Sequence, residues 1–262
     1  MLQFPDIDPV ILKIGPLSMR WYGLMYIFGF VSSYLLVIYQ LKKKALKIDR
    51  AIIDDLFFYL ILGLIVGARL GYVIFYNLGF YLENPLDIFI IWRGGMSFHG
   101  GLIGTFIVCL LVIKKKKLNF FQTVDLIIPT CPIGIGFGRL GNFINGELFG
   151  KPASVPWAML FPEGGPSPRH PSQLYEMFFE GILLFCILWI YKDKKKRDGD
   201  VFALFLILYG LFRIFCELFR EADSQLGYFF SLLSMGQILS ICMIAIGVVL
   251  KYIYLPRTSR QA

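Results

Sequence analysis

The polar residues best suited to chemistry lie in residues 138–150, whose sequence is Gly-Arg-Leu-Gly-Asn-Phe-Ile-Asn-Gly-Glu-Leu-Phe-Gly. This stretch contains one arginine, two amides and one carboxylate: Arg139, Asn142, Asn145 and Glu147. The rest of the chain is strongly apolar, and a charged side chain near lipid is costly unless it is paired or faces water. We therefore expect this stretch to line a wet cavity that the protein uses.

Two further sets of polar residues belong with this stretch. At 100° per residue, four side chains fall on one narrow stripe of an otherwise apolar helix: Tyr209, Arg213, Glu217 and Arg220. His99 lies between two glycine pairs in residues 94–101. We expect the helices that carry these residues to converge on a single cavity.

The chemistry that these residue types favour is recognition of a phosphate. Two guanidinium groups, of Arg139 and Arg213, can bind phosphate oxygens through paired hydrogen bonds and stay charged at neutral pH. Near a bilayer this indicates a phospholipid headgroup. His99 is the best candidate proton acceptor, although it could instead only orient a loop. The other histidine, His170, has no ligand-spaced neighbours, so we expect no metal and no other cofactor.

The elements that must position these residues are membrane-spanning helices. Of the 262 residues, 57% are hydrophobic, and the mean hydropathy is +0.67. Several apolar runs reach the length of about 20 residues that a helix needs to cross a bilayer. The sequence predicts an all-α polytopic membrane protein, with 1–262 forming one catalytic domain. The predicted seven spans are 19–41, 52–76, 97–113, 119–140, 173–191, 200–219 and 232–254.

The basic residues predict the orientation of these spans. The net charge is +8, and most Lys and Arg lie in short runs at 42–50, 114–117, 192–197 and 251–260. Such runs mark the cytoplasmic side, which places the N-terminus outside, the C-terminus inside and the polar residues toward the outer face. Runs of this kind between apolar segments favour contact with the lipid bilayer and argue against nucleic-acid binding. The fourth span should be irregular, because six Pro and Gly residues lie between 129 and 141.

Several stretches resemble one enzyme family, the bacterial prolipoprotein diacylglyceryl transferases. They are residues 138–150 together with 20–26, 94–101, 169–176, 209–220 and 234–237. The resemblance implies transfer of diacylglycerol from phosphatidylglycerol to the thiol of the lipobox cysteine in a prolipoprotein signal peptide. Glycerol phosphate is released in this first step of lipoprotein maturation. It also implies a multi-pass protein of the bacterial cytoplasmic (inner) membrane, with its active site toward the outer face.

Within that reaction, the expected catalytic residues are His99, Arg139 and Arg213. The arginines would stabilise the leaving phosphate, and His99 would accept the thiol proton. Glu217 would orient an arginine, and Asn142 would hold the headgroup or an arginine. The resemblance adds Tyr22 to the site. The expected substrate-binding residues are Tyr22, Arg139, Asn142, Asn145, Glu147, Tyr209, Arg213 and Glu217.

Other interpretations stay open at this point. An intramembrane serine hydrolase could use Ser97 with His170 or His99, and a lipid or anion transporter could place arginines beside broken helices. A binder of secretory precursors is a third possibility.

Individual residues also have structural alternatives. Arg139 could be an interface anchor, Arg213 and Glu217 could form a structural ion pair, and Glu147 could fix a loop. Arg69, inside the second span, could pair with Glu217, with Asp125 or with a carbonyl.

Overall fold

The computed structural model describes residues 2–5, 7–15, 17–44, 48–221, 228–229 and 233–255. The predicted start of the last span, Leu232, and the two chain ends lie outside these residues. The chain forms two compact units, a larger one of Met1–Val37 with Val124–Ala262 and a smaller one of Ile38–Thr123. The boundaries fall inside two helices, α1 (Trp21–Lys44) and α5 (Phe120–Ile127).

Six helical stretches among the described residues are long and apolar enough to cross a membrane. They are Trp21–Lys43, Arg50–Tyr76, Phe98–Lys115, Phe120–Ile144, Ser172–Tyr191 and Met235–Tyr254. The protein is thus a helical, multi-span membrane protein, and six of the predicted spans agree with the structure to within a few residues. The other predicted span, 200–219, corresponds to α9 (Asp200–Glu217). This helix is not among the six, and it carries three charged residues.

The fourth predicted span is interrupted at one point rather than along its length. After α5, a 3-10 turn, η3 (Ile128–Thr130), contains Pro129 and leads into α6 (Cys131–Ile144). The prediction of an irregular span is confirmed at Pro129, because proline cannot donate the helical hydrogen bond. It is wrong for the glycines, since α6 runs without interruption through residues 134–141.

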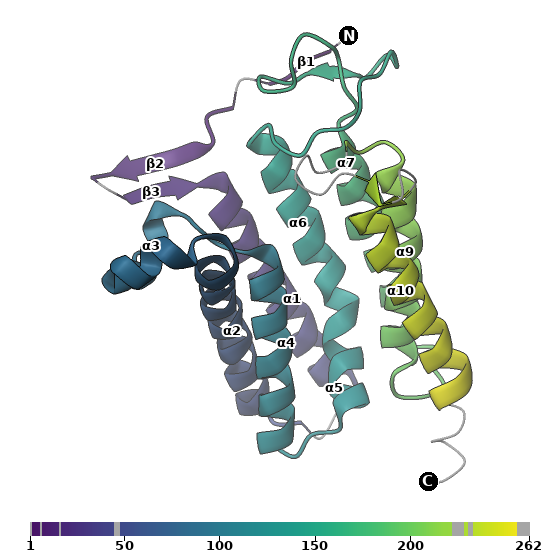
Figure 1. Ribbon diagram of the computed structural model, residues 1–262. Coiled ribbons are helices and arrows are strands. Elements are labelled where there is room, and N and C mark those ends of the chain that lie inside the picture. The colour runs from purple at the N-terminus through teal and green to yellow at the C-terminus, as the bar shows by residue number, and fades with distance from the viewer. Residues whose placement is uncertain are drawn as a thin grey trace. The chain divides into compact units, whose positions relative to one another are not determined.

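The glycines of α6 instead allow close helix packing in the larger unit. The partner of α6 is the segment made of α7 (Ser172–Glu176), the π-helical turn η4 (Met177–Leu183) and α8 (Leu184–Tyr191). A Cβ added to Gly181 would lie 2.8 Å from the Cα of Gly136, so neither glycine can be enlarged without movement. Figure 1 shows α9 beside α10 (Met235–Val249), which continues into the π-helical turn η5 (Leu250–Tyr254).

The start of α9 is fixed from another helix. Asp125, on α5, accepts hydrogen bonds from the backbone N–H groups of Gly199 (2.8 Å) and Phe202 (2.9 Å). The same carboxylate lies 2.8 Å from Nζ of Lys195. Because the first N–H groups of a helix have no partner within the helix, the buried Asp125 acts as a cap for α9 from a distant part of the chain.

Short strands, which the all-α prediction does not include, accompany the helices of the larger unit. A hairpin of β2 (Val10–Ile14) and β3 (Leu17–Arg20) precedes α1. β1 (Leu2–Gln3) pairs in parallel with β4 (Met159–Leu160), in the loop before α7. β5 (Tyr228–Phe229) pairs with β6 (Leu233–Ser234), just before α10. The loop before α7 is therefore tied to the first residues of the chain.

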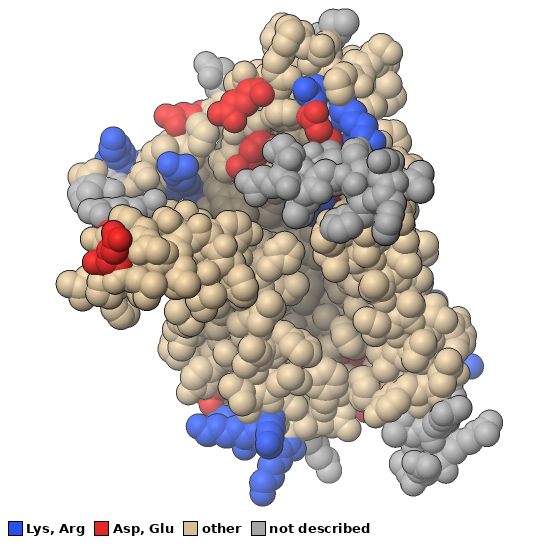
Figure 2. Space-filling view, in the orientation of Figure 1, with Lys and Arg blue, Asp and Glu red and all other residues tan. Residues whose placement is uncertain are grey.

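The smaller unit is built on two helices, α2 (Arg50–Tyr76) and α4 (Phe98–Lys115). They pack through glycines: a Cβ on Gly100 would lie 2.4 Å from the carbonyl oxygen of Gly67, and one on Gly104 would lie 2.3 Å from that of Gly63. Between them run α3 (Leu78–Glu83) and two 3-10 turns, η1 (Pro85–Phe89) and η2 (Ile91–Arg93). Figure 2 shows Lys and Arg gathered where α4 ends, in its last turn and the residues that follow.

Candidate active site

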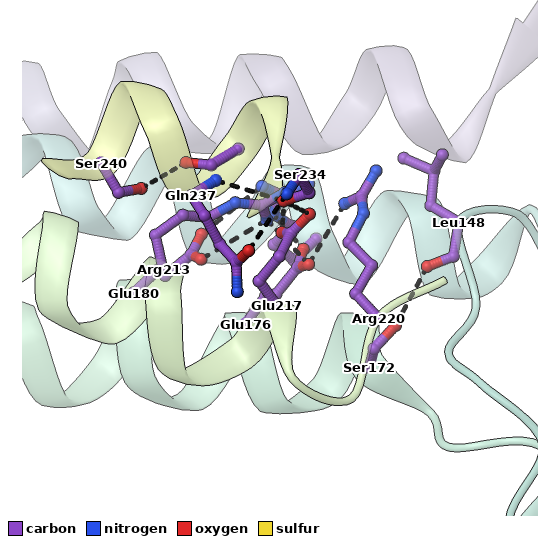
Figure 3. Close-up of polar contacts among 12 residues, drawn as sticks. Leu148, Ser172, Glu176, Glu180, Arg213, Glu217, Arg220, Ser234, Gln237 and Ser240 are labelled. Carbon is purple, nitrogen blue, oxygen red and sulfur yellow. Dashed lines mark hydrogen bonds and ion pairs between the residues drawn. The ribbon is translucent and has the colours of Figure 1, made fainter. Parts of the chain in front are cut away.

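A buried group of three arginines and three glutamates lies in the larger unit. Its members come from α6, α7, η4, α9 and the turn after α9: Arg139, Glu176, Glu180, Arg213, Glu217 and Arg220. Figure 3 shows Glu176 between Arg213 and Arg220, with Glu217 beside them. Three positive and three negative charges make the group formally neutral when all six side chains are ionised.

Glu176 is the centre of this group. Its Oε2 lies 2.7 Å from Nε of Arg139, and its Oε1 lies 2.9 Å from Nη1 of Arg213 and 3.1 Å from Nη1 of Arg220. The side chain of Glu176 is 1% exposed. A buried carboxylate needs such partners, because an unpaired charge in a low-dielectric interior is very unfavourable.

Glu180 and Glu217 complete the set of partners. Glu180, one helical turn after Glu176, has its Oε2 3.4 Å from Nη2 of Arg139. Glu217 has its Oε2 2.7 Å from Nη2 of Arg213, at the i, i+4 spacing that brings two side chains together on α9. Each arginine is therefore held in a set orientation.

Glu217 also joins this group to the start of α10. The hydroxyl of Ser234 donates to Oε1 of Glu217 at 2.9 Å, and Ser234 forms a capping box with Gln237 at the first turn of the helix (Figure 3). A Cβ on Gly236 would lie 3.1 Å from the carboxyl group of Glu217. The close approach of α10 to this carboxylate thus depends on a glycine.

The amides of the 138–150 stretch form a second arrangement, around Glu147. Asn142 and Asn145 both donate through Nδ2 to Oε1 of Glu147, at 2.9 and 3.1 Å. Gln173, on α7, donates to the backbone carbonyl of Glu147 at 2.7 Å. Asn142 therefore contacts a carboxylate here, whereas the sequence interpretation gave it the headgroup or an arginine.

The two predicted tyrosines lie beside these groups. The hydroxyl of Tyr22, on α1, is 3.2 Å from that of Tyr26, and a Cβ on Gly141 would lie 2.9 Å from the Tyr22 ring. Tyr22 is close enough to both Glu147 and Arg139 to interact with their charges. Tyr209, on α9, interacts in the same way with Arg139 and Arg213. Eight predicted site residues thus lie in the larger unit, on α1, α6, α9 and the loop after α6.

His99 belongs to the smaller unit, where it is exposed in the first turn of α4. Ser97 directly precedes this helix, and its Oγ accepts a hydrogen bond from the N–H of Gly100 at 3.2 Å. Ser97 is buried, with 6% of its surface exposed. Its task as the N-cap of α4 gives a structural reason for this serine, which weakens the serine hydrolase interpretation.

The loop before α7 is held by a chain of aromatic and basic residues. Trp157 donates to the hydroxyl of Tyr175 at 2.6 Å, and that hydroxyl is 3.0 Å from Nδ1 of His170. Burial lowers the pKa of His170 below its ordinary value. Arg169 donates to the carbonyl of Gly164 at 2.7 Å and pairs with Glu221. Through these contacts His170 and Arg169 hold the loop before α7 in place.

The site residues that sequence reasoning missed are Glu176 and Glu180. Both lie inside an apolar segment, four positions apart, so they share one face of the helix. Carboxylates inside an apolar segment need cations. The polar stripe predicted for residues 209–220 offers Arg213 and Arg220, although Arg220 lies in the turn after α9. The spacing of Glu176 and Glu180 therefore indicates from the sequence that they need cations. It does not indicate which arginine pairs with which glutamate.

Comparison with known proteins identifies the family of this chain. The family model for prolipoprotein diacylglyceryl transferase matches residues 9–253. A phosphatidylglycerol–prolipoprotein diacylglyceryl transferase of Bordetella avium is 51% identical over 263 residues, covering 100% of both chains. Proteins of the same name from Bordetella parapertussis and Nitratidesulfovibrio vulgaris are 53% and 50% identical, over 94% of this chain and 95% and 94% of their own lengths. On these matches, the chain belongs to the prolipoprotein diacylglyceryl transferase family.

Proposed function

We propose that this protein transfers the diacylglyceryl group of phosphatidylglycerol to the thiol of the lipobox cysteine in prolipoprotein signal peptides. Glycerol phosphate leaves, and the reaction is the first step of lipoprotein maturation. The observation that carries the proposal is the full-length match to relatives that bear the name of this activity. The helical membrane fold and the buried arginines suit a lipid substrate with a phosphate group.

The proposed topology has seven spans, in which α9 is the sixth along the chain and is added to the six apolar stretches. The charges of α9 do not argue against it, because Arg213 and Glu217 are paired within the larger unit. The N-terminus is outside and the C-terminus is in the cytoplasm, since the basic runs follow alternate spans. The whole chain acts as one catalytic domain in the bacterial inner membrane, with the active site toward the outer face.

The reaction forms a bond from the cysteine sulfur to a glycerol carbon and breaks the bond between that carbon and the phosphate oxygen. The bonding electrons leave with the phosphate, and the thiol proton goes to His99. Arg139 and Arg213 stabilise the charge that builds up on the phosphate. Tyr22, Asn142, Asn145, Glu147, Tyr209 and Glu217 bind the substrate or fix the arginines that do.

Arg139 is the arginine best placed to receive the phosphate. Its side chain is 19% exposed, compared with 13% for Arg213 and 7% for Arg220. Its Nε and Nη2 face glutamates, and its Nη1 has no partner among the described residues. The glutamates hold the guanidinium still before the substrate arrives, so little reorganisation is needed during the reaction.

The test is transfer by the purified protein in detergent, with labelled phosphatidylglycerol and a lipobox peptide. We expect the peptide to gain the mass of a diacylglyceryl group on its cysteine and glycerol phosphate to appear in equal amount. A peptide with serine in place of that cysteine is the matched control and should gain nothing. Labelling of the protein by a fluorophosphonate, without a mass gain on the peptide, would favour the hydrolase instead.

A further inference from the structure

Arg69 lies in α2 with a buried side chain, and its partners are backbone carbonyls. The residue is 5% exposed, in a helix that is apolar enough to span the membrane. From its place in the sequence, Arg69 could pair with Glu217, with Asp125 or with a carbonyl. The structure resolves this, because Arg69 donates to carbonyl oxygens of the smaller unit.

All five N–H groups of the guanidinium are accounted for. Nε donates to the carbonyl of Ile88 at 2.8 Å. Nη1 donates to those of Gly94 at 2.7 Å and Gly95 at 2.9 Å. Nη2 donates to those of Asp87 at 2.6 Å and Ile90 at 3.2 Å. Arginine has five such donors in a planar fork, so this side chain has no donor left for a substrate.

These contacts fix a segment that would otherwise need water. Residues 87–95 form 3-10 turns and irregular backbone, without the regular hydrogen-bond ladder of an α-helix. Phe89 and Trp92 are 76% and 57% exposed, so the surface of this segment suits lipid. Irregular backbone beside lipid is tolerated only where other groups satisfy its hydrogen bonds. Arg69 supplies five of these bonds at once.

The segment leads directly into the helix turn that carries His99. Gly95 is held so closely that a Cβ on it would lie 2.9 Å from Nη1 of Arg69, and its φ is +79°. Two residues later, the N–H of Ser97 donates to the carbonyl of Ala68, the neighbour of Arg69, at 2.9 Å. Ser97 then caps α4, with His99 in its first turn.

We infer that Arg69 is a positioning residue, which fixes the backbone of residues 87–95 and, through it, the orientation of His99. Its five donors are all used by backbone carbonyls, so Arg69 acts through the backbone that it holds. The part of the inference that concerns His99 rests on the proposed function, whereas the part that concerns the backbone does not.

The variant that tests this is Arg69→Lys. It keeps the positive charge but replaces five donors by one nitrogen, which cannot reach carbonyls spread around a planar fork. The matched control is Gly63→Ala, in the same helix pair but away from the segment. A Cβ there would lie 2.8 Å from Cγ2 of Val108, so this change strains the α2–α4 packing without touching residues 87–99.

The first measurement is hydrogen–deuterium exchange of the backbone amides of residues 90–100 in the purified full-length protein. We expect exchange at Gly94, Ser97 and Gly100 to be at least about tenfold faster in Arg69→Lys than in the wild type. Gly63→Ala should match the wild type in this segment. Unchanged exchange in Arg69→Lys, or equal acceleration in Gly63→Ala, would overturn the inference. This measurement needs no enzymatic activity.

The second measurement is a double-mutant cycle with His99→Asn, using transfer to a lipobox peptide. In the protein with His99 present, Arg69→Lys should lower kcat by about ten- to a hundredfold, with a smaller change in KM. In the His99→Asn background the further loss should stay below about twofold, because the group that Arg69 positions is gone. Equal losses in both backgrounds would contradict the action through His99. A wild-type protein without transfer would instead contradict the proposed function, and exchange would still decide the role of Arg69.

Discussion

The guanidinium Nε of Arg139, on α6, lies 2.7 Å from Oε2 of Glu176, on α7. An arginine expected to bind phosphate is thus already held by a carboxylate. The same carboxylate also contacts Arg213 and Arg220, so one acid controls the position of three cations. Replacing one of these charged side chains by an uncharged one therefore tests how much the others depend on it.

Replacing Glu176 by Gln should destabilise the protein strongly. The change leaves three arginines, which are at most 19% exposed, with two carboxylates. Removing one partner of a buried ion pair costs about 3–5 kcal/mol. We expect a lower unfolding temperature in detergent and loss of transfer. Glu221→Gln is the control, because Glu221 also pairs with an arginine but is 49% exposed, so its loss should cost less than about 1 kcal/mol. Equal effects of the two substitutions would contradict the central role of Glu176.

Arg213→Lys should lower transfer by about a hundredfold or more. Nη1 and Nη2 of Arg213 reach two different glutamates, at 2.9 and 2.7 Å, and a single ammonium group cannot copy this fork. Losing one preorganised charge at a developing anion typically costs about 10²–10³ in rate. Arg197→Lys, near the other end of α9, should leave turnover nearly normal. Near-normal turnover of Arg213→Lys would argue against its catalytic role.

His99→Asn should reduce the rate by about 10²–10⁴, which is the usual contribution of a general base. Asparagine keeps a polar side chain of similar size but cannot accept the thiol proton. The pH–rate profile of kcat/KM should lose the limb that belongs to the base. A milder loss with an unchanged profile would return His99 to a structural role in the turn that begins α4.

Gly100→Ala should destabilise the α2–α4 packing. A Cβ on Gly100 would lie 2.4 Å from the carbonyl oxygen of Gly67 and 2.9 Å from the Cα of Gly71. Overpacking of this kind costs about 1–3 kcal/mol, which should appear as a lower unfolding temperature. Gly79→Ala, where the added Cβ meets no atom within 4 Å among the described residues, should behave as the wild type.

Stability should fall as the pH drops from neutral through about 6.5, partly because of His170. Burial lowers its pKa in the folded protein below the ordinary 6.5, so between these two values the unfolded chain binds more protons. Protonation therefore favours unfolding in this window. His170→Gln should make the unfolding temperature less dependent on pH between about 7 and 5. An identical slope in both proteins would show that another group titrates.

The helical fold could be predicted because its physical cause is visible in the sequence. Apolar runs gave six spans to within a few residues, and Pro129 marked the break between α5 and α6. The glycines of α6 led to the wrong prediction of an irregular helix. Glycine weakens an isolated helix, but here it allows the close packing that stabilises α6. The strand pairing of residues 2–3 with 159–160 joins distant segments, and no local pattern indicates it.

The candidate site was predictable by residue type but not by pairing. The stripe of α9 correctly brought Arg213 and Glu217 together, because their spacing along one helix is local information. Glu176 and Arg139 lie on different helices, and their contact depends on how those helices pack. The partners of Arg69 are backbone carbonyls, which every residue carries, so composition could not single them out.

The pairing of Arg213 with Glu176 also bears on how the protein is made. On the proposed topology, the segment of Ser172–Tyr191 and α9 are joined only by residues 192–199. Inserted alone, the segment of Ser172–Tyr191 would bring Glu176 and Glu180 into the bilayer without a cation, at about 2.5–3.5 kcal/mol for each charge near its centre. Inserted together as a hairpin, they cancel these charges as they enter. We therefore expect a nascent chain that ends before α9 to be held poorly in the membrane, and the two helices to be integrated as one step of biosynthesis.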